Sequence, residues 1–208
     1  MPKPNKVGFV GLGAMGIGMA TQLLKKGFEV AAVEVREEVK DRWISAGGEW
    51  CESPSAAAID ADVFVAMVVN AEQIESVLFG GKGALKKLRP NSVIIVTSTV
   101  SPSFSRELGK RLGDSGHLFI DAPVSGGVVG AESGGLSIMA SGSDEAFELV
   151  NRFSRRWPPG SIASEQNPDS ARSSRRSTSC WLDLILRSPR KRWRSEPVPG
   201  WTQTFYLK

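Results

Sequence analysis

A glycine-rich turn between a strand pattern and a helix pattern constrains the fold of this chain more than any other feature. The segment Gly11-Leu12-Gly13-Ala14-Met15-Gly16 follows residues 7–10, whose apolar and β-branched side chains are typical of a buried strand. Apolar residues then recur at helical spacing as far as Gly27, which predicts a helix over residues 15–26. Such a turn joins a parallel strand to a helix that packs closely against it, so the chain has to fold around βα units.

The first 150 residues repeat this strand-then-helix alternation. Strands are predicted over residues 7–10, 30–34, 63–69, 92–97, 118–121 and 137–140. Helices are predicted over residues 15–26, 37–46, 71–78, 102–112 and 144–152. Since crossovers between parallel strands are right-handed, the predicted fold is α/β, a Rossmann-type doubly wound parallel sheet.

The context of the glycine turn predicts dinucleotide binding. Gly11 permits the turn, Gly13 lets the backbone approach a pyrophosphate, and Gly16 lets the helix pack on the strand. The helix N-terminus offers N–H groups to the phosphates. Glu34, at the end of the second predicted strand, is suited to an adenosine ribose and favours NAD. Arg36 either holds the 2′-phosphate of NADP or is a solvated surface charge.

Composition narrows the class of protein. The chain holds two cysteines, far apart and without metal-ligand spacing, which predicts neither a disulfide framework nor a metal site and fits the cytoplasm. The opening MPKPNKVG predicts no signal peptide, and the longest apolar runs are too short to span a bilayer.

His117 has no acidic partner near it in sequence and is expected at the surface.

The charge changes sign near residue 150. Residues 1–150 hold 14 Lys and Arg against 18 Asp and Glu, a net charge of −4, whereas residues 151–208 hold 12 against 4, a net charge of +8. The second part also holds four of the six tryptophans and shows neither helical nor strand periodicity. We therefore predict a dinucleotide-binding domain over residues 1–153 and a largely disordered basic tail over residues 154–208.

Several segments resemble those of the β-hydroxyacid dehydrogenase family, which includes the 3-hydroxyisobutyrate dehydrogenases. FVGLGAMGIGMATQLLKKG is similar to the N-terminal signature of that family, and TSTVSP and DAPVSGG resemble its cofactor-contacting and substrate-binding segments. MVVNAEQIESVLFG and DAPVSGGVVGAESG are closest to the sugar-acid branch that includes L-threonate dehydrogenase. The resemblance covers residues 6 to about 153.

The resemblance implies a fold, a reaction and a set of site residues. Family members add a helical domain to the Rossmann domain and oxidise a short hydroxy acid by hydride transfer to NAD or NADP. The cofactor-binding residues it implies are Gly11, Leu12, Gly13, Ala14, Met15, Gly16, Glu34, Val68, Val69 and Thr99. The substrate-binding residues it implies are Ser125, Gly126 and Gly127, although Gly135 stands where the family commonly has threonine. The oligomeric state stays open.

The lysine that performs the chemistry of this family is missing. It belongs to a GxGxxxK-type segment that opens the helical domain, and its ammonium group exchanges the proton of the substrate hydroxyl. After Lys110 the chain contains only Lys191 and Lys208, and neither stands in such a segment. The sequence thus assigns no catalytic residue, and this chain is expected to be inactive.

A frameshift accounts for the loss. Codons can be chosen for residues 172–183 that, read from the last base of the Arg172 codon, translate as IVKTIHQLLAG, which is similar to the lysine helix of the family. In the same frame, codons chosen for residues 189–200 translate as AEAMALGARAG, which is similar to the next helix. Two alternatives stay open: a non-catalytic dinucleotide-binding module whose Arg/Trp tail contacts nucleic acid, and an enzyme that borrows a lysine from a partner chain. The frameshift explains the tail composition with fewer assumptions than nucleic-acid binding does.

Overall fold

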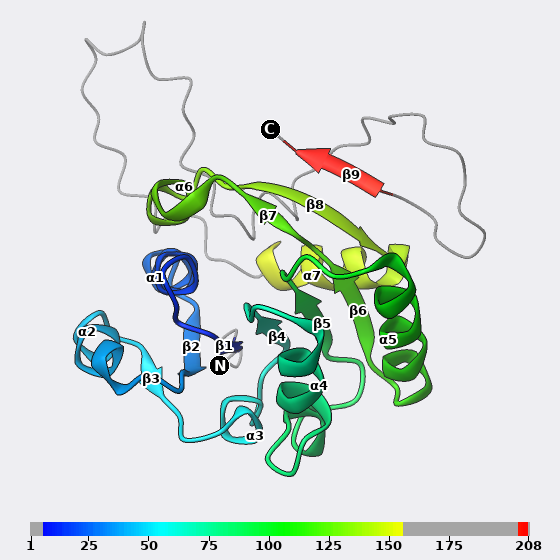
Figure 1. The fold of residues 1–208 in the computed structure, drawn as a ribbon, viewed down its shortest axis with the longest axis horizontal. Helices are drawn as coiled ribbons and strands as arrows, with labels where there is room; N and C mark the ends of the chain where they lie inside the picture. The colour runs from blue at the N-terminus through cyan, green and yellow to red at the C-terminus, as the bar shows by residue number, and fades with distance from the viewer. Residues whose placement is uncertain (1–5, 156–203, 208) are drawn as a thin grey trace, which may run out of the picture.

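One β-sheet runs through the molecule in the computed structural model, which describes residues 6–155 and 204–207 (Figure 1). The strand order is β3-β2-β1-β4-β5-β6-β8-β7, with β9 paired to β8. The pairings from β3 to β6 are parallel. The strands are β1 Lys6–Val10, β2 Glu29–Val33, β3 Glu49–Trp50, β4 Val63–Ala66, β5 Val93–Val96, β6 Leu118–Asp121, β7 Val124–Ser125, β8 Ser137–Gly142 and β9 Thr204–Leu207. Since the strand order reverses at β1, the carboxyl ends of β1 and β4 flank the topological switch point, where sheets of this type bind ligands.

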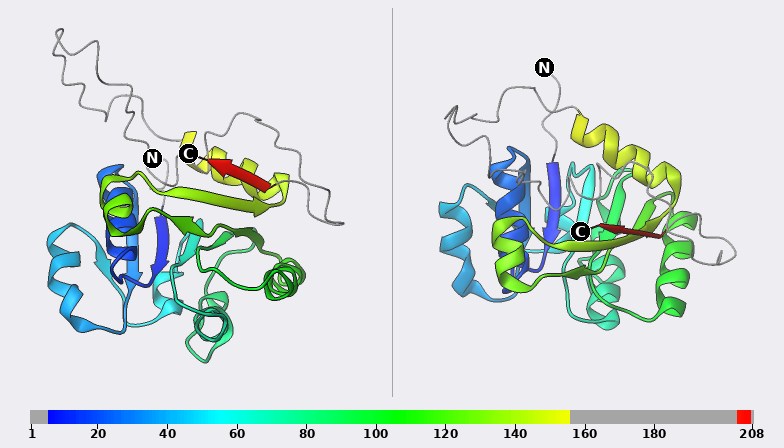
Figure 2. Two further views of the ribbon diagram at one scale, coloured as in Figure 1. Left: turned by 45° about the horizontal axis from the view of Figure 1, so that its top comes forward. Right: turned by 90° about the horizontal axis from the view of Figure 1, so that it is seen from above.

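Helices cover both faces of the sheet (Figure 2). The helices are α1 Gly16–Lys25, α2 Lys40–Ser45, α3 Pro54–Ala57, α4 Ala71–Phe79, α5 Pro102–Asp114, α6 Gly127–Ser133 and α7 Asp144–Arg155, with 3-10 turns at Glu37–Val39 and Ala84–Lys86. Side chains of α1, α2, α6 and α7 join one apolar core, and those of α3, α4 and α5 join a second core on the opposite face.

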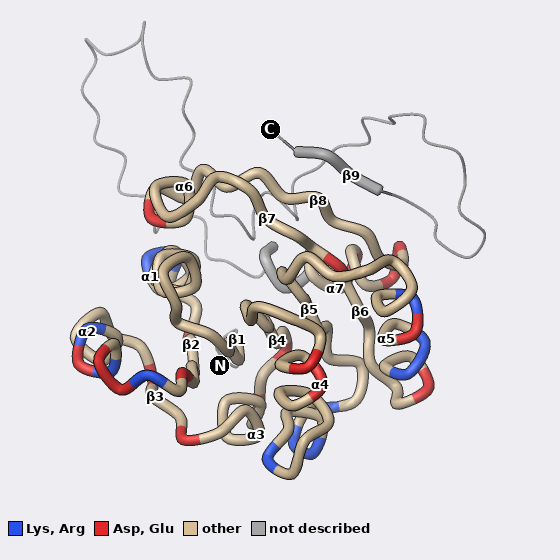
Figure 3. The backbone as a smooth tube through the Cα atoms, in the orientation of Figure 1, with Lys and Arg blue, Asp and Glu red and all other residues tan. Residues whose placement is uncertain are grey.

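The strand sequences explain this double layer. In β4, Val63 and Val65 belong to the first core while Phe64 and Ala66 belong to the second. In β5, Ile95 and Ile94 divide in the same way. Successive side chains of a strand point to opposite faces, so a continuous apolar run is buried only if both faces are covered, as in parallel α/β sheets. Many of the charged residues stand on the helices and outer turns, as the colouring of α2 and α5 in Figure 3 shows.

The doubly wound fold predicted from the sequence is confirmed, but several boundaries differ. The strand predicted over 63–69 ends at Ala66, and the helix predicted over 37–46 is divided into a 3-10 turn and α2. Arg36 before that turn is extended, as the residue that precedes a helical turn usually is, and 3-10 turns are frequent at the start of α-helices. The strand predicted over 137–140 is antiparallel to its neighbours, because α6 between β7 and β8 returns the chain in the opposite direction. The short elements β3, α3, β7 and α6 are not among the predicted ones.

The prediction that His117 lies at the surface is wrong, because the residue is buried. The residue is 8% exposed, and its Nδ1 has no hydrogen-bond partner among the described residues. It lies at the entry to β6, where its N–H donates to the carbonyl of Leu112 at the end of α5. Burial lowers the pKa of His117, which favours the neutral imidazole.

Most of the predicted tail lies outside the described residues. Helix α7 runs to Arg155, two residues beyond the predicted domain end. Thr204–Leu207 forms β9, a strand not predicted from the sequence, which pairs antiparallel with β8 from Ile138 to Ser141. None of the helices in the described ranges has the length and apolar character needed to cross a membrane.

Candidate functional site

The glycine turn lies at the carboxyl end of β1 and begins α1 (Figure 1). Gly11 has φ +97°, and a Cβ placed on it would come within 2.1 Å of the carbonyl oxygen of Met67. A Cβ on Gly16 would come within 1.8 Å of the carbonyl oxygen of Gly11. Both contacts are to backbone that cannot move aside, so these two positions require glycine. They fix the turn against β4 and hold α1 close to it.

Gly13 is different because a Cβ there would meet the end of a flexible side chain and no backbone. A Cβ there would meet only Nη2 of Arg36, at 3.0 Å, and the residue is not in the left-handed region. Leu12 is buried, while Ala14 is exposed and Met15 packs on the core beneath the turn. The turn therefore presents its backbone outward at Gly13, as close approach of a pyrophosphate requires.

The first turn of α1 adds a favourable field. Its N-cap, Met15, makes no side-chain hydrogen bond to the helix, and no acidic residue lies in the first turn. The leading N–H groups of the helix and the positive end of its dipole thus face the same region as Gly13. An anion held there would receive backbone hydrogen bonds without a competing carboxylate.

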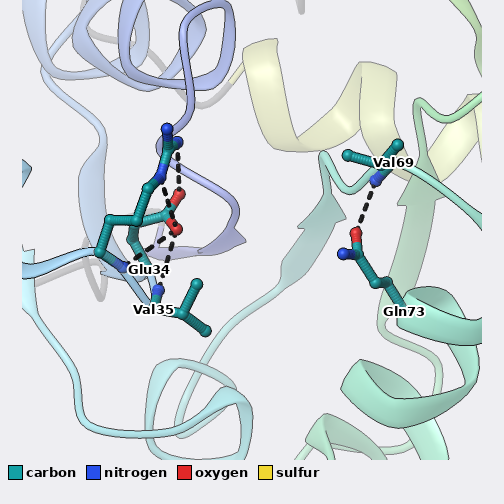
Figure 4. Close-up of polar contacts among 5 residues, drawn as sticks. Glu34, Val35, Val69 and Gln73 are labelled. Atoms are coloured by element: carbon teal, nitrogen blue, oxygen red, sulfur yellow. Dashed lines mark hydrogen bonds and ion pairs between the residues drawn. The ribbon is translucent and has the colours of Figure 1, made fainter.

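Glu34 follows β2 directly, beside the glycine turn. Its Oε1 accepts hydrogen bonds from the N–H groups of Val35, at 2.9 Å, and Arg36, at 3.2 Å (Figure 4). The Arg36 guanidinium pairs with the same carboxylate, Nε to Oε1 and Nη2 to Oε2, both at 3.4 Å. The Glu34 side chain is 7% exposed and the Arg36 side chain 55%. Arg36 is therefore not a freely solvated charge but part of an ion pair at the end of β2.

The segments after β4 and β5 lie across from Glu34 at the same edge of the sheet (Figure 4). Val69 is 81% exposed, and its N–H donates to Oε1 of Gln73 at 2.8 Å (Figure 4). Val68 is half-buried, and its carbonyl oxygen accepts a hydrogen bond from Ser98 Oγ. Thr99 follows at the exposed end of the β5 segment. These bonds hold the backbone of both segments while leaving apolar surface at Val69 free.

Ser125 ends β7, Gly126 is the N-cap of α6, and Gly127 is the first residue of that helix. All three are exposed, and Gly126 and Gly127 have φ +133° and +62°, which favour glycine. Helix α6 lies alongside α1, as Figures 1 and 2 show, and the side-chain amide of Gln22 donates to the carbonyl of Glu132. The segment is therefore fixed on the same side of the sheet as the helix that begins at the glycine turn.

A carboxyl group near this segment was not singled out from the sequence. Asp121, the last residue of β6, accepts a hydrogen bond from Ser105 Oγ at 2.8 Å. Burial raises the pKa of the Asp121 carboxyl, and the bond from Ser105 opposes that rise. The pair ties the N-terminal half of α5, which follows Thr99, to the strand that leads into Ser125.

The structure thus brings the predicted cofactor residues to one edge of the sheet. Gly11 to Gly16, Glu34, Val68, Val69 and Thr99 all follow carboxyl ends of neighbouring strands. The sequence analysis did not identify Gln73 and Ser98, which hold the backbone of Val69 and Val68. For Gln73 a signal was present, because Asn70 three residues before it is typical of a helix start. No cluster of three or more metal-ligating side chains is found within residues 6–155 and 204–207.

Comparisons with known proteins agree with this geometry. A family model described as the NAD binding domain of 6-phosphogluconate dehydrogenase matches residues 6–155. The chain is 47% identical over 146 residues to L-threonate dehydrogenase of Cupriavidus necator, covering 70% of this chain and 49% of that protein.

Solved structures extend the likeness to the fold. The structure of 3-hydroxyisobutyrate dehydrogenase from Salmonella typhimurium superposes with a TM-score of 0.68 at 33% identity, covering 74% of this chain and 53% of that one. Psf3 in complex with NADP+ and 2-OPP superposes with a TM-score of 0.66 at 30% identity, covering 73% and 54%. The chain spans about half the length of the relatives it matches. Residues 6–155 are an NAD(P)-binding domain of the 6-phosphogluconate dehydrogenase type, and the chain belongs to the β-hydroxyacid dehydrogenase family.

Proposed function

We propose that this chain is the cofactor-binding half of an NAD(P)-dependent dehydrogenase that oxidises a short hydroxy acid. The observation that carries the proposal is the glycine turn at the switch point of the sheet, where Gly13 leaves its backbone open toward the N-terminus of α1. The proposed reaction transfers a hydride from a secondary or primary alcohol of the substrate to the nicotinamide ring. The 47% identity to L-threonate dehydrogenase supports a sugar acid as the substrate class.

Each site residue has a proposed role that follows from its position. The backbone of the glycine turn would hold the pyrophosphate, Glu34 would face the adenosine ribose, and three side chains would line the dinucleotide. The hydroxyl and N–H groups of the segment before α6 would receive the substrate carboxylate. The residues in these roles are Gly11, Leu12, Gly13, Ala14, Met15, Gly16, Glu34, Val68, Val69, Thr99, Ser125, Gly126 and Gly127.

We further propose that the chain as given binds cofactor without turning over substrate. No lysine in residues 154–208 has the family motif around it, and arginine is too basic to exchange a proton near neutral pH. Residues 1–153 would form the domain and residues 154–208 an out-of-frame segment. The shifted reading IVKTIHQLLAG supports this division, because it resembles the lysine helix of the family. The chain covers only 49% of L-threonate dehydrogenase of Cupriavidus necator, which is consistent with a missing second half.

A frame-restored gene tests the proposal. The given chain and a chain with one base inserted near codon 153 of the source gene are assayed for reduction of NAD and NADP with a panel of C3 and C4 hydroxy acids. We expect turnover only from the restored chain, and saturable cofactor binding by both. Turnover by the given chain at the rate of the restored one would refute inactivity, and absence of cofactor binding by both would refute the proposed role of the glycine turn.

We place the protein in the cytoplasm. The support is Cys51, a buried free thiol, which is the ordinary state of cysteine in a reducing compartment.

A further inference from the structure

Helix α6, which begins at the segment 125–127, lies alongside the helix that begins at the glycine turn (Figures 1 and 2). We propose that Gly18 and Gln22 of α1 are positioning residues: through the backbone of α6 they set the place of residues 125–127 relative to the glycine turn, and thereby the affinity for the substrate carboxylate. The inference rests on the proposed function, because it requires residues 125–127 to receive that carboxylate.

Gly18 is a glycine in the interior of a helix. Its backbone is not in the left-handed region, and glycine stabilises a helix less than alanine does, so local structure gives no reason for it. A Cβ on Gly18 would lie 3.0 Å from the carbonyl carbon of Ala131 and from the backbone nitrogen of Glu132. Both atoms belong to the backbone of α6, so alanine fits only if α6 moves away by a few tenths of an ångström. The missing side chain therefore sets the closest approach of the two helices.

Gln22 adds a directional contact one turn further along α1. Its side-chain amide donates to the carbonyl oxygen of Glu132, in the last turn of α6, where carbonyls lack a partner within the helix. Nη2 of Arg42 also lies 3.8 Å from Oε1 of Glu132, but both side chains are more than half exposed, so this ion pair contributes little. The contacts that hold α6 from this side are therefore those of Gly18 and Gln22.

The connections of α6 leave its position to these contacts. Gly126 and Gly127 at its start have φ +133° and +62°, and Gly134 at its C-cap has φ +72°. Glycine restricts the path of the chain less than any other residue. Ala131, which faces Gly18, is fully buried, whereas Val129 on the same helix is 78% exposed. Packing on α1, more than the linking segments, therefore determines where α6 lies.

A displacement of α6 would move the substrate segment and not the glycine turn. Gly126 is the N-cap of α6 and Gly127 its first residue, so both follow the helix. The turn is held by other contacts, since a Cβ on Gly11 would meet the carbonyl of Met67 and a Cβ on Gly16 the carbonyl of Gly11. Changes in the contact between α1 and α6 should therefore weaken substrate binding and spare cofactor binding.

NMR titrations of the isotope-labelled full chain separate the two ligands. NAD is added to saturation, and the panel of C3 and C4 hydroxy acids follows, read at the amides of Gly126 and Gly127. Misplacement by a few tenths of an ångström predicts hydroxy-acid binding about 5- to 30-fold weaker in Gly18→Ala. Gln22→Ala loses one hydrogen bond, which predicts about 2- to 10-fold. In both, the Kd for NAD should change less than about twofold, and the two amides should shift before any ligand is added.

Gly113→Ala is the matched control, because a Cβ there meets nothing within 4 Å, and it should leave both affinities unchanged. Equal weakening of NAD and hydroxy-acid binding would overturn the inference, because a purely structural role lowers the folded fraction and affects both ligands alike. Unchanged hydroxy-acid binding in both variants would also overturn it, as would a wild-type chain that binds NAD and no hydroxy acid.

Two further outcomes are distinct. If Gly18→Ala does not fold, Gln22→Ala decides the question, because alanine is favoured in a helix and introduces no backbone contact there. If the wild-type chain binds neither NAD nor a hydroxy acid, the proposed function itself fails.

Discussion

Replacing Gly13 with alanine separates the folding of the glycine turn from its capacity to hold a dinucleotide. The added Cβ would contact only Nη2 of Arg36, at 3.0 Å, which is the free end of a long and half-exposed side chain. Since Gly13 is not in the left-handed region, alanine is not strained there. The methyl group would instead occupy the space through which a pyrophosphate approaches the backbone.

The expected magnitudes differ for stability and binding. An unstrained Gly→Ala change stabilises by about 0.4–1 kcal/mol through the unfolded state. Displacing the partly exposed Glu34–Arg36 pair costs about 0.2–1 kcal/mol, so the free energy of unfolding should change by less than about 1 kcal/mol. A methyl forced into a filled contact costs about 1–3 kcal/mol. That range corresponds to a Kd for NAD raised by about 5- to 150-fold.

Urea denaturation and calorimetric titration of NAD measure the two quantities on the same samples. Gly113→Ala is the control, because a Cβ at that position in α5 meets nothing within 4 Å. It should leave NAD binding unchanged. Binding of NAD by Gly13→Ala with wild-type affinity would refute the proposed role of Gly13, as would a free energy of unfolding several kcal/mol lower than that of Gly113→Ala.

Three further predictions follow from the described contacts. Gly16→Ala places a Cβ 1.8 Å from the Gly11 carbonyl oxygen, so urea denaturation should show a loss of more than about 3 kcal/mol or no folded protein at all. Burial lowers the pKa of His117, so the unfolded chain binds its proton more readily. The free energy of unfolding linked to His117 is complete above about pH 6.5 and is lost as the pH falls below that value. In a His117→Gln variant, the free energy of unfolding should therefore depend less on pH between about pH 7.5 and 5.5. Equal pH dependence in the two chains would contradict this. The pKa of the Cys51 thiol is raised to about 11, mainly by burial and secondly by the nearby Glu49 carboxylate. In a Cys180→Ser chain, we therefore expect Cys51 to react with a disulfide reagent only after unfolding.

The parallel core could be predicted because its residues signal structure locally. Continuous apolar runs such as residues 93–96 and 63–66 can be buried only between two helical layers, and the strand at 118–121 was predicted at its observed bounds. Gly11 and Gly16 fix the turn through close backbone contacts, which are general to turns between a strand and a helix of this type. Sequence pattern therefore suffices where period and turn chemistry act over a few residues.

Other features depend on contacts that the sequence does not display. The strand β3 is two residues long and exists because β2 offers it an edge, so no periodic signal marks it. In the sequence, His117 is only a polar residue before a strand, and its burial follows from the packing of α5 over β6. The pairing of Arg36 with Glu34 was equally hidden, because two residues after a strand the chain can turn a side chain either inward or away.

Cofactor binding at the carboxyl edge of the sheet is tested most directly by titrating the isotope-labelled full chain with NAD and following the amide NMR shifts. We expect saturable shifts confined to that edge, at Gly11 to Gly16, Glu34 and Val68 to Thr99, with the amide of His117 at the opposite edge unmoved. Absence of binding, or shifts centred on the outer side of α1 and α6 instead of this edge, would contradict it.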